Sequence, residues 1–535
     1  MKTKWRSIWM GLVLLLAACA GVPQAPAPPS PAPTPSPAAR AQPQRTPTPD
    51  RRPLIETPAW FNEATLYQIF PRSFYDSDGD GIGDLNGIRQ KLDYIQSLGV
   101  DTIWLNPHYP ATSYHGYDVV DYFEVNPEFG TLEDFKALLV ELKQRDMRLI
   151  VDYVANHTSL AHPYFKDAYL NPSSPYTDWF LFKDAQNRTY ASFFGTGYLP
   201  EWNHSNRAVR EYLIRAALFW LELGVDGLRC DYARGVEHWF WGELRAAVKT
   251  QYPDAVLLGE VWDGQTAVLQ QYFLDGFDAL FDFPWYLLMT GGDNVNGGGV
   301  INGQLPPSVL YGALGAMQRL YPRGAQIVRF PSNHDTNRIA SAVQGDPARM
   351  RLMAAAAFLM PGIPIIYYGE EIGMRGTKGQ GAAYDEYRRE PMDWYAAEEG
   401  PGMTRWFRPA DRHNRPYDGV SVEEQEGDPD SLLNFYRRLG RLRREHPSLR
   451  ATSFQLLDEV EGCASVCLGL WRWDGSEVAL VIFNFSAEPQ AVRVPIERAP
   501  RPLRGEPTSL LGAEAQAQHV QLEPWGVSLQ LWRSR

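Results

Sequence analysis

Three acidic side chains follow predicted β-strands and could act together in acid and nucleophilic chemistry. Asp231 ends the run GLRCD, Glu260 ends AVLLGE, and Asp335 ends IVRFPSNHD. Hydrolysis of a glycosidic bond with retention needs a carboxylate nucleophile and a carboxylic acid about 5 to 5.5 Å apart. Neighbouring strands lie about 4.8 Å apart, so residues at the ends of adjacent strands can satisfy this separation. Asp231 and Glu260 are therefore the candidate pair.

A basic residue accompanies the first of these carboxylates. Arg229 lies two residues before Asp231, on the same face of the strand, where it could keep Asp231 ionised. An isolated Asp at a strand end is more often solvated or caps a helix. Three carboxylates with basic partners at fixed spacing favour a catalytic group instead.

An aspartate-rich loop near residue 80 has the spacing of a calcium site. In DSDGDGIGD the ligands occupy alternate positions, with Gly81 at the turn position. The predicted ligands are Asp76, Asp78, Asp80, the carbonyl of Ile82, and Asp84. Gly87 stands where an EF-hand has its bidentate Glu, so the loop is not an EF-hand. The alternative is a turn without metal, although carboxylates this close repel one another without a cation.

These side chains need a scaffold that brings the strand ends together. Eight β-rich runs alternate with helix-like stretches such as 131–147, which carries an apolar stripe. The runs are 65–70, 102–107, 148–154, 227–231, 255–260, 279–283, 327–335 and 363–371. The alternation predicts an α/β fold, a (β/α)8 TIM barrel, whose active site lies at the carboxyl ends of its strands.

Composition changes mark the other predicted parts of the chain. We expect the barrel over 59–449, and a long stretch rich in Pro, Asn and aromatic residues predicts an inserted subdomain over about 158–206, after the third strand. Beyond it, alternating apolar patterns predict a C-terminal antiparallel β-sandwich domain over 450–535.

The first 58 residues resemble an export signal followed by a tether. Basic residues precede a short apolar run within 1–18, and 19–58 is rich in proline, which favours an extended linker. The run ends in LAAC, which resembles the bacterial lipoprotein box with Cys19 as the lipidated residue. We expect an exported protein attached to the cell envelope by a lipid anchor. An ordinary signal peptide with a chance Cys is the alternative.

Overall composition excludes several classes of protein. The chain has 535 residues and a net charge of −12, which argues against nucleic acid as its partner. Four Cys cannot form a disulfide scaffold, although Cys463 and Cys467 could form a local disulfide in an exported protein or remain free thiols. Mean hydropathy of −0.34 excludes a polytopic membrane protein.

Four motifs in order resemble those of the α-amylase family, glycoside hydrolase family 13, close to its oligo-1,6-glucosidase and neopullulanase branches. They are DYVANH (152–157), GLRCDYAR (227–234), GEVW (259–262) and FPSNHD (330–335). The resemblance implies that Asp231 is the nucleophile, Glu260 the general acid and base, and Asp335 a third carboxylate that binds sugar hydroxyls. It also implies sugar-binding roles for Tyr117, His157, Arg229 and His334, and a calcium loop after the first strand.

Several positions depart from the family pattern. Many α-amylases hold a second calcium between barrel and insert, using an Asn that Asn156 matches and a His that Gly235 replaces. Tyr232 follows the nucleophile where Ala or Val is usual, and Arg234 stands where a Lys is common. Tyr114 replaces an Asp that blocks the cleft in α-glucosidases, which favours longer substrates.

The combined reading is a retaining hydrolase of α-glucosidic, mainly α-1,4, bonds in starch-derived glucans and maltooligosaccharides. The alternatives within the family are an α-glucosidase or oligo-1,6-glucosidase, and a transglycosylase such as a trehalose synthase. A non-catalytic glucan-binding protein is a more remote alternative, because the three carboxylates are all present.

Overall fold

The structure is a computed structural model that describes residues 50, 52–293, 298–379, 384–463, 465–512 and 519–534. The described residues do not include the predicted signal, Cys19 or most of the predicted tether. They also do not include residues 294–297, which belong to a glycine-rich segment, 291–303. None of the helices in the described ranges is long and apolar enough to cross a bilayer.

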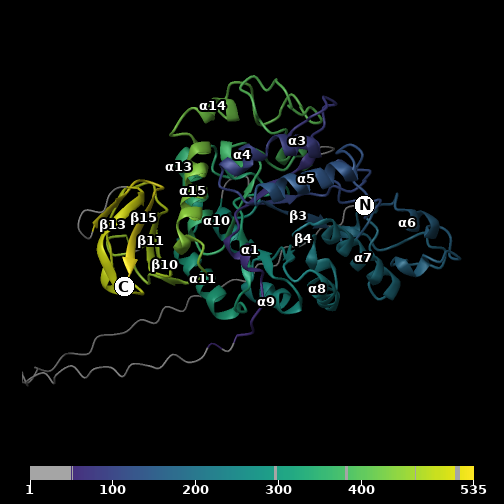
Figure 1. The fold of residues 1–535 in the computed structure, drawn as a ribbon, viewed down its shortest axis with the longest axis horizontal. Coiled ribbons are helices and arrows are strands. Elements are labelled where there is room, and N and C mark those ends of the chain that lie inside the picture. Colours follow the sequence, from purple (N-terminus) through teal and green to yellow (C-terminus); the bar gives the residue numbers. More distant parts are fainter. Residues whose placement is uncertain are drawn as a thin grey trace, which may run out of the picture. The chain divides into compact units, whose positions relative to one another are not determined.

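Eight parallel strands close into a barrel in sequence order, with β8 pairing back to β1 (Figure 1). They are β1 (Leu66–Ile69), β2 (Thr102–Leu105), β3 (Arg148–Tyr153), β4 (Gly227–Cys230), β5 (Val256–Gly259), β6 (Ala279–Phe281), β7 (Gln326–Arg329) and β8 (Ile363–Tyr367). Nearly every strand residue is buried, as expected for a parallel sheet covered by helices. The predicted TIM barrel is confirmed.

Helices connect the strands and cover the barrel. They are α1 (Ala59–Glu63), α2 (Pro71–Phe74), α3 (Leu85–Gln90), α4 (Leu92–Ser97), α5 (Leu132–Gln144), α6 (Pro163–Ala168), α7 (Arg207–Leu223), α8 (His238–Gln251), α9 (Thr266–Asp275), α10 (Phe283–Thr290), α11 (Ser308–Leu320), α12 (Ile339–Ala342), α13 (Pro347–Leu359), α14 (Val422–Glu426) and α15 (Leu432–Glu445). Short 3-10 helices include η2 (Phe193–Gly195) and η3 (Ala233–Gly235).

Local sequence signals explain where the long helices begin and end. Thr131 and Asp134 form a capping box at the start of α5, and Phe135, Leu138 and Leu142 bury its apolar stripe. The side chain of Asn206 caps the start of α7. Helix α7 ends at Gly224, whose φ of 110° is accessible to glycine at little cost.

The first described residues cross the amino-terminal end of the barrel. The N–H of Ile55 donates to the carbonyl of Arg323, three residues before β7 (2.8 Å). Thr57 donates to the carbonyl of Asp278, directly before β6 (3.2 Å), and Trp60 to that of Asp254, just before β5 (2.9 Å). The chain therefore reaches the barrel at the end opposite to the carboxyl ends of the strands.

The segment between β3 and α7 is held by isolated bridges rather than by a regular sheet. Phe180 pairs with Trp202, Phe182 with Tyr190, and Ser192 with Pro200, while His157 pairs with Glu201. Aromatic rings fill its interior, including the stacked pair Phe180 and Trp202 with ring centroids 4.9 Å apart. We call residues 158–206 the insert.

The C-terminal part is an antiparallel β domain, as predicted. A five-stranded sheet has the order β13, β15, β11, β10, β9, and β12 pairs with β14 in a second sheet (Figure 1). The strands are β9 (Phe454–Leu456), β10 (Cys467–Asp474), β11 (Glu477–Asn484), β12 (Gln490–Arg493), β13 (Leu503–Leu511), β14 (His519–Leu522) and β15 (Val527–Ser534).

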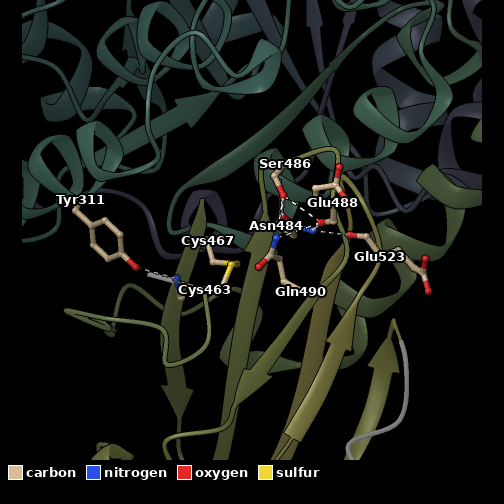
Figure 2. The surroundings of a disulfide bond; sticks show 9 residues. Tyr311, Cys463, Cys467, Asn484, Ser486, Glu488, Gln490 and Glu523 are labelled. Atoms are coloured by element: carbon tan, nitrogen blue, oxygen red, sulfur yellow. Dashed lines mark hydrogen bonds between the residues drawn. A yellow bond between two sulfur atoms is a disulfide. The ribbon is translucent and has the colours of Figure 1, made fainter. Parts of the chain in front are cut away.

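One disulfide and several buried polar contacts order this domain. Cys463 and Cys467 are joined at the start of β10, which resolves the two alternatives in favour of the disulfide. Figure 2 shows Asn484 nearby, whose side-chain nitrogen donates to the carbonyls of Glu488 (2.8 Å) and Glu523 (2.9 Å). These bonds tie together the loops at that end of the sheet.

Polar contacts of Gly469 and Arg472 are among those that attach the β domain to the barrel. The N–H of Gly469 on β10 donates to the hydroxyl of Tyr311 on α11 (3.1 Å), a contact visible in Figure 2. The guanidinium group of Arg472 is fully buried and donates to the carbonyls of Leu359 (3.1 Å) and Met360 (3.3 Å) at the end of α13. It also donates to the carbonyl of Ala451 (2.6 Å).

Candidate active site

The candidate catalytic carboxylates lie at the carboxyl ends of their barrel strands. Asp231 follows β4 directly and its N–H donates to the carbonyl of Tyr153 on β3 (3.0 Å). Glu260 follows β5 and its N–H donates to the carbonyl of Cys230 on β4 (3.0 Å). These bonds continue the barrel ladder by one residue, so the rigid sheet fixes where both side chains begin.

Arg229 joins the carboxylates of neighbouring strands. Its Nη1 lies 2.5 Å from Asp152 Oδ1 and 2.8 Å from Asp231 Oδ1, and its Nη2 lies 2.7 Å from Glu260 Oε1. The guanidinium group is fully buried, so these pairs are little screened by solvent. The predicted partner of Asp231 therefore also contacts Glu260, and Asp152 completes the charge group.

Burial changes the ionisation of the two facing carboxyl groups. It raises the pKa of Asp231 to about 7 and that of Glu260 to about 7, and Arg229 partly opposes both shifts. Each negative charge also disfavours the other, so the pair tends to retain one proton near neutral pH. One acid and one carboxylate that line the same cavity are the combination that retaining hydrolysis requires.

Asp335 stays ionised for a different reason. Burial opposes its charge, but His334 and Arg389 outweigh burial and hold the pKa of Asp335 well below its usual range. Arg389 Nη2 lies 2.8 Å from Asp335 Oδ1, and His334 Nε2 lies 2.9 Å from Oδ2. Burial lowers the pKa of His334 to about 4, so at neutral pH Arg389 is the cation that compensates Asp335.

The two predicted sugar-binding histidines are held as neutral donors. Gln68 donates to Nδ1 of His334 (2.8 Å), which leaves the ring proton on Nε2, beside Asp335 and the hydroxyl of Tyr117 (2.6 Å). The rings of Tyr117 and His334 stack with centroids 5.5 Å apart. Asn156 approaches Nδ1 of His157 (3.2 Å), and burial lowers the pKa of His157 to about 3.

The three carboxylates line one cavity of about 730 Å³, and the predicted residues Arg229 and His334 lie behind its wall. Its walls include Asp231, Glu260, Asp335, Tyr117 and His157, together with His115, Phe193, Phe194, Tyr198, Leu199, Tyr232, Arg234, Trp262, Asp385 and Arg389. Nε2 of His157 is buried and has no partner among the described residues. The cavity thus presents acid, carboxylate, neutral imidazole and aromatic groups, the combination that binds and cleaves sugars.

Sequence reasoning missed Arg389 and the aromatic wall. Arg389 is 54 residues from Asp335 and no spacing links them; its neighbour Tyr114 places a hydroxyl 3.3 Å from Nη1 and stacks on Trp406. Phe193 and Phe194 belong to the insert, whose irregular path gives no periodic signal. Trp262 lies in GEVW and could have been found from that motif.

The aspartate-rich loop gathers three of its predicted ligands. Carboxylate oxygens of Asp76, Asp78 and Asp84 lie within 4.8 Å of one another. Asp80 stands outside this group, and its carboxylate accepts the N–H of Ile82 (2.7 Å). Three converging carboxylates are the donor set that a hard cation prefers. The loop therefore suits a divalent metal without Asp80 as a member of the cluster.

Comparison with known proteins agrees with this geometry. Residues 68–452 match the family model described as the catalytic domain of α-amylase. Alpha-amylase 3 of Dictyoglomus thermophilum is 36% identical over 403 residues, which are 72% of this chain and 77% of that protein. A trehalose synthase/amylase of Mycobacterium tuberculosis is 30% identical over 515 residues, covering 82% of this chain and 84% of that protein.

Solved structures give the same result. The α-amylase from H. orenii superposes with a TM-score of 0.74 at 31% identity, covering 88% of this chain and 99% of that one. The α-amylase from Geobacillus thermoleovorans, solved with acarbose, gives a TM-score of 0.70 at 28% identity, with coverage of 89% and 99%.

Proposed function

The chain belongs to the α-amylase family of glycoside hydrolases, and we propose that it hydrolyses α-1,4 bonds of maltooligosaccharides and starch fragments with retention. The observation that carries the proposal is the single guanidinium group of Arg229, which contacts both Asp231 and Glu260 inside one cavity. Membership of the family supports glycosidase activity on α-glucans. The preference for α-1,4 bonds is what we propose in addition.

The chemistry runs in two displacements. Asp231 attacks the anomeric carbon while Glu260 gives its proton to the departing sugar oxygen, which breaks the glycosidic bond and forms a glycosyl ester. Glu260, now a carboxylate, takes a proton from water, whose oxygen attacks the anomeric carbon and releases Asp231. The shared proton of the pair is assigned to Glu260 because its carboxyl group must protonate the leaving oxygen.

The remaining cavity groups bind the sugar that reacts. Nε2 of His157 and the carboxylate of Asp335 offer a donor and an acceptor to ring hydroxyls. Tyr117 offers an aromatic face, supported by its stack on His334. Arg389 keeps Asp335 charged. The hydrogen bonds that the Asp335 carboxylate accepts from sugar hydroxyls therefore strengthen as positive charge develops on the sugar ring.

We also propose that the cation of the aspartate-rich loop is calcium. The support is a set of carboxylates on the loop between α2 and α3, where the carbonyl of Ile82, predicted from the spacing, would be a further oxygen ligand. Calcium accepts several oxygen ligands in flexible geometry, whereas magnesium demands a stricter octahedron. The ion would hold the loop in place and take no part in the reaction.

We further propose that the mature protein is exported and attached to the cell envelope by a lipid on Cys19. The support is the order of basic residues, short apolar run and LAAC in the first 19 residues, followed by the proline-rich stretch. The disulfide between Cys463 and Cys467 agrees with an oxidising compartment.

Transglycosylation is the second candidate activity. It is favoured by the 30% identity to a trehalose synthase/amylase over most of both chains. The same carboxylates would serve, since the glycosyl ester can be attacked by a sugar hydroxyl in place of water. An α-glucosidase would use the same residues and release single glucose units from chain ends.

A product analysis separates these activities. Purified enzyme and its Asp231→Asn variant are incubated with a maltooligosaccharide ladder, maltose, isomaltose and pullulan, and products are resolved by chromatography. Shorter maltooligosaccharides of α configuration, absent with the variant, are the expected result. Trehalose or longer products would favour the transglycosylase, and cleavage of isomaltose alone would contradict the α-1,4 preference.

A further inference from the structure

Two departures from the family pattern, Tyr232 and Gly235, are linked in space. A Cβ atom built on Gly235 would lie 2.4 Å from Cδ1 and Cε1 of the Tyr232 ring. A side chain at position 235 would therefore displace that ring. Gly235 makes room for an aromatic residue directly after the nucleophile.

The Tyr232 ring is gripped by two residues of the insert. Its centroid lies 4.8 Å from that of Phe193 and 5.2 Å from that of Phe194, and the two phenylalanine rings are 4.5 Å apart. We call these three residues the aromatic clamp. Phe193 also contacts the ring of His157 (4.7 Å), so the clamp spans two walls of the cavity.

The clamp is built on a strained backbone. Tyr232 has φ 39° and ψ 54°, and Phe194 has φ 47° and ψ 22°, both in the left-handed region that bulky residues avoid. Phe194 is also 75% exposed, so burial of its own ring does not explain its conformation. Strain of this kind persists where neighbouring contacts determine the conformation, which points to a positional role.

The backbone of Tyr232 contacts the general acid. Its N–H donates to Oε2 of Glu260 (3.0 Å), while Oε1 faces Arg229. The N–H belongs to the peptide plane between Asp231 and Tyr232, and the left-handed φ and ψ of Tyr232 direct its ring toward the insert. Because Phe193 and Phe194 hold that ring, the insert restrains the residue whose N–H binds Glu260.

The metal site that many α-amylases have between barrel and insert does not fit here. Gly235 supplies no ligand, and Oδ1 of Asn156 would lie 2.3 Å from a Cβ at that position, so Asn156 and the Tyr232 ring occupy the space of a longer side chain. The contact between barrel and insert at this point consists of aromatic rings.

We propose that the aromatic clamp positions the carboxyl group of Glu260 and fixes the insert over the cleft without a metal ion. Tyr232 is thus a positioning residue that acts through its backbone N–H, and the insert is coupled to catalysis through its two phenylalanines. The proposal rests on the proposed glycosidase activity only for its kinetic readout.

Kinetics of Tyr232→Ala and Tyr232→Phe test the positioning role. The Ala variant frees the backbone from its strained conformation, and we expect kcat to fall about a hundredfold with a smaller change in KM. Loss of the N–H bond removes a group that favours the carboxylate, so the alkaline limb of the pH profile should move to higher pH. The Tyr232→Phe variant keeps the ring and should retain the native kcat and the native alkaline limb of the pH profile.

Limited proteolysis tests the hold on the insert independently of any substrate. Trypsin can cleave at Lys183 and Arg188, and cleavage there should be faster in Tyr232→Ala than in the native full-length chain. The double variant Phe193→Ala and Phe194→Ala should show the same shift in pH profile and proteolysis, and combining it with Tyr232→Ala should add little further. This double variant keeps the test valid if Tyr232→Ala fails to fold.

Leu160→Ala is the matched control, because Leu160 belongs to the insert and is exposed, and it is not among the residues that line the cavity. This variant should leave the alkaline limb of the pH profile and the rate of tryptic cleavage of the insert unchanged. A Tyr232→Ala enzyme with native kcat, pH profile and proteolysis would overturn the proposal. The claim that the insert is fixed without a metal ion has a separate test, in a variant that carries Asp76→Asn and Asp78→Asn. Faster tryptic cleavage of the insert of this variant on adding EDTA would overturn that claim. Absence of activity on α-glucans in the native enzyme would refute the proposed function and leave the proteolysis result standing.

Discussion

Asp231 and Glu260 have different proposed roles, and their substitutions should therefore have different kinetic signatures. Asp231→Asn removes the proposed nucleophile, and we expect turnover to fall by about a thousandfold or more on every substrate. Glu260→Gln removes the proton donor and should cost about a hundredfold to ten-thousandfold on maltooligosaccharides. The leaving group of an activated aryl glycoside departs without a proton. With this substrate, the rate of the first displacement should largely recover in Glu260→Gln and should stay low in Asp231→Asn.

The measurement is release of reducing sugar and of the aryl alcohol under single-turnover conditions. Asp254→Asn serves as a control, because Asp254 is an exposed carboxylate at the opposite end of β5. Equal recovery of both active-site variants on the aryl substrate would contradict the assignment of roles.

The pH dependence follows from the raised pKa of the buried pair. Burial raises the pKa of Glu260 from 4.5 to about 7, so its proton is present below that pH and lost above it. We expect kcat/KM to fall as the pH rises through about 7, and to fall again in acid when the pair takes up its second proton. A profile that stays flat from acid to well above neutral pH would argue against Glu260 as the acid.

At the scale of elements, the barrel could be predicted because its signals are local. Each strand is a short apolar run that ends in polar residues, and four of the runs carry recognisable motifs. The partner of Asp335 could not be predicted, since Arg389 comes from an irregular segment after β8 and reaches the site only through the closure of the barrel. The aromatic clamp could not be predicted because its phenylalanines lie in the insert. The insert is irregular, so no periodic pattern in its sequence indicates which side chains meet.

The aspartate-rich loop allows a test of which aspartates bind the proposed cation. The sequence spacing counts Asp80 as a ligand, whereas the structure gathers Asp76, Asp78 and Asp84. EDTA should lower the melting temperature of the native enzyme, because a bound cation stabilises the folded state. Asp78→Asn should abolish this effect and Asp80→Asn should retain it, as measured by thermal unfolding with and without added calcium. Loss of the effect in both variants would restore Asp80 as a ligand.

A buried cation, Arg472, contributes to the junction of the barrel and the β domain. Arg472 donates to three backbone carbonyls, and burial lowers its pKa well below the ordinary value because carboxylate partners do not compensate it. Arg472→Met keeps much of the volume but leaves these carbonyls unsatisfied, which should lower the free energy of unfolding by about 2 to 4 kcal/mol.

Denaturant unfolding of Arg472→Met measures this change, and Arg441→Met on the exposed side of α15 is the control. The control should differ from the native enzyme by less than about 0.5 kcal/mol. A stability of Arg472→Met equal to that of the control would mean that solvent or neighbouring groups satisfy the carbonyls.

At the scale of the whole molecule, the proposed anchor predicts where the enzyme is found. Cys19→Ser should move activity from the membrane fraction to the soluble extracytoplasmic fraction, without changing kcat or KM, because the catalytic residues are far along the chain. Fractionation of cells that express each form, followed by an activity assay, checks this. Retention of the Cys19→Ser protein in the membrane fraction would contradict lipid attachment at this residue.

Residues 53–60 cross the amino-terminal ends of β5, β6 and β7, at the pole of the barrel opposite to the catalytic cavity. The length of the barrel strands separates this segment from the groups that face the substrate. A substitution here should therefore change the stability of the enzyme and leave KM unchanged.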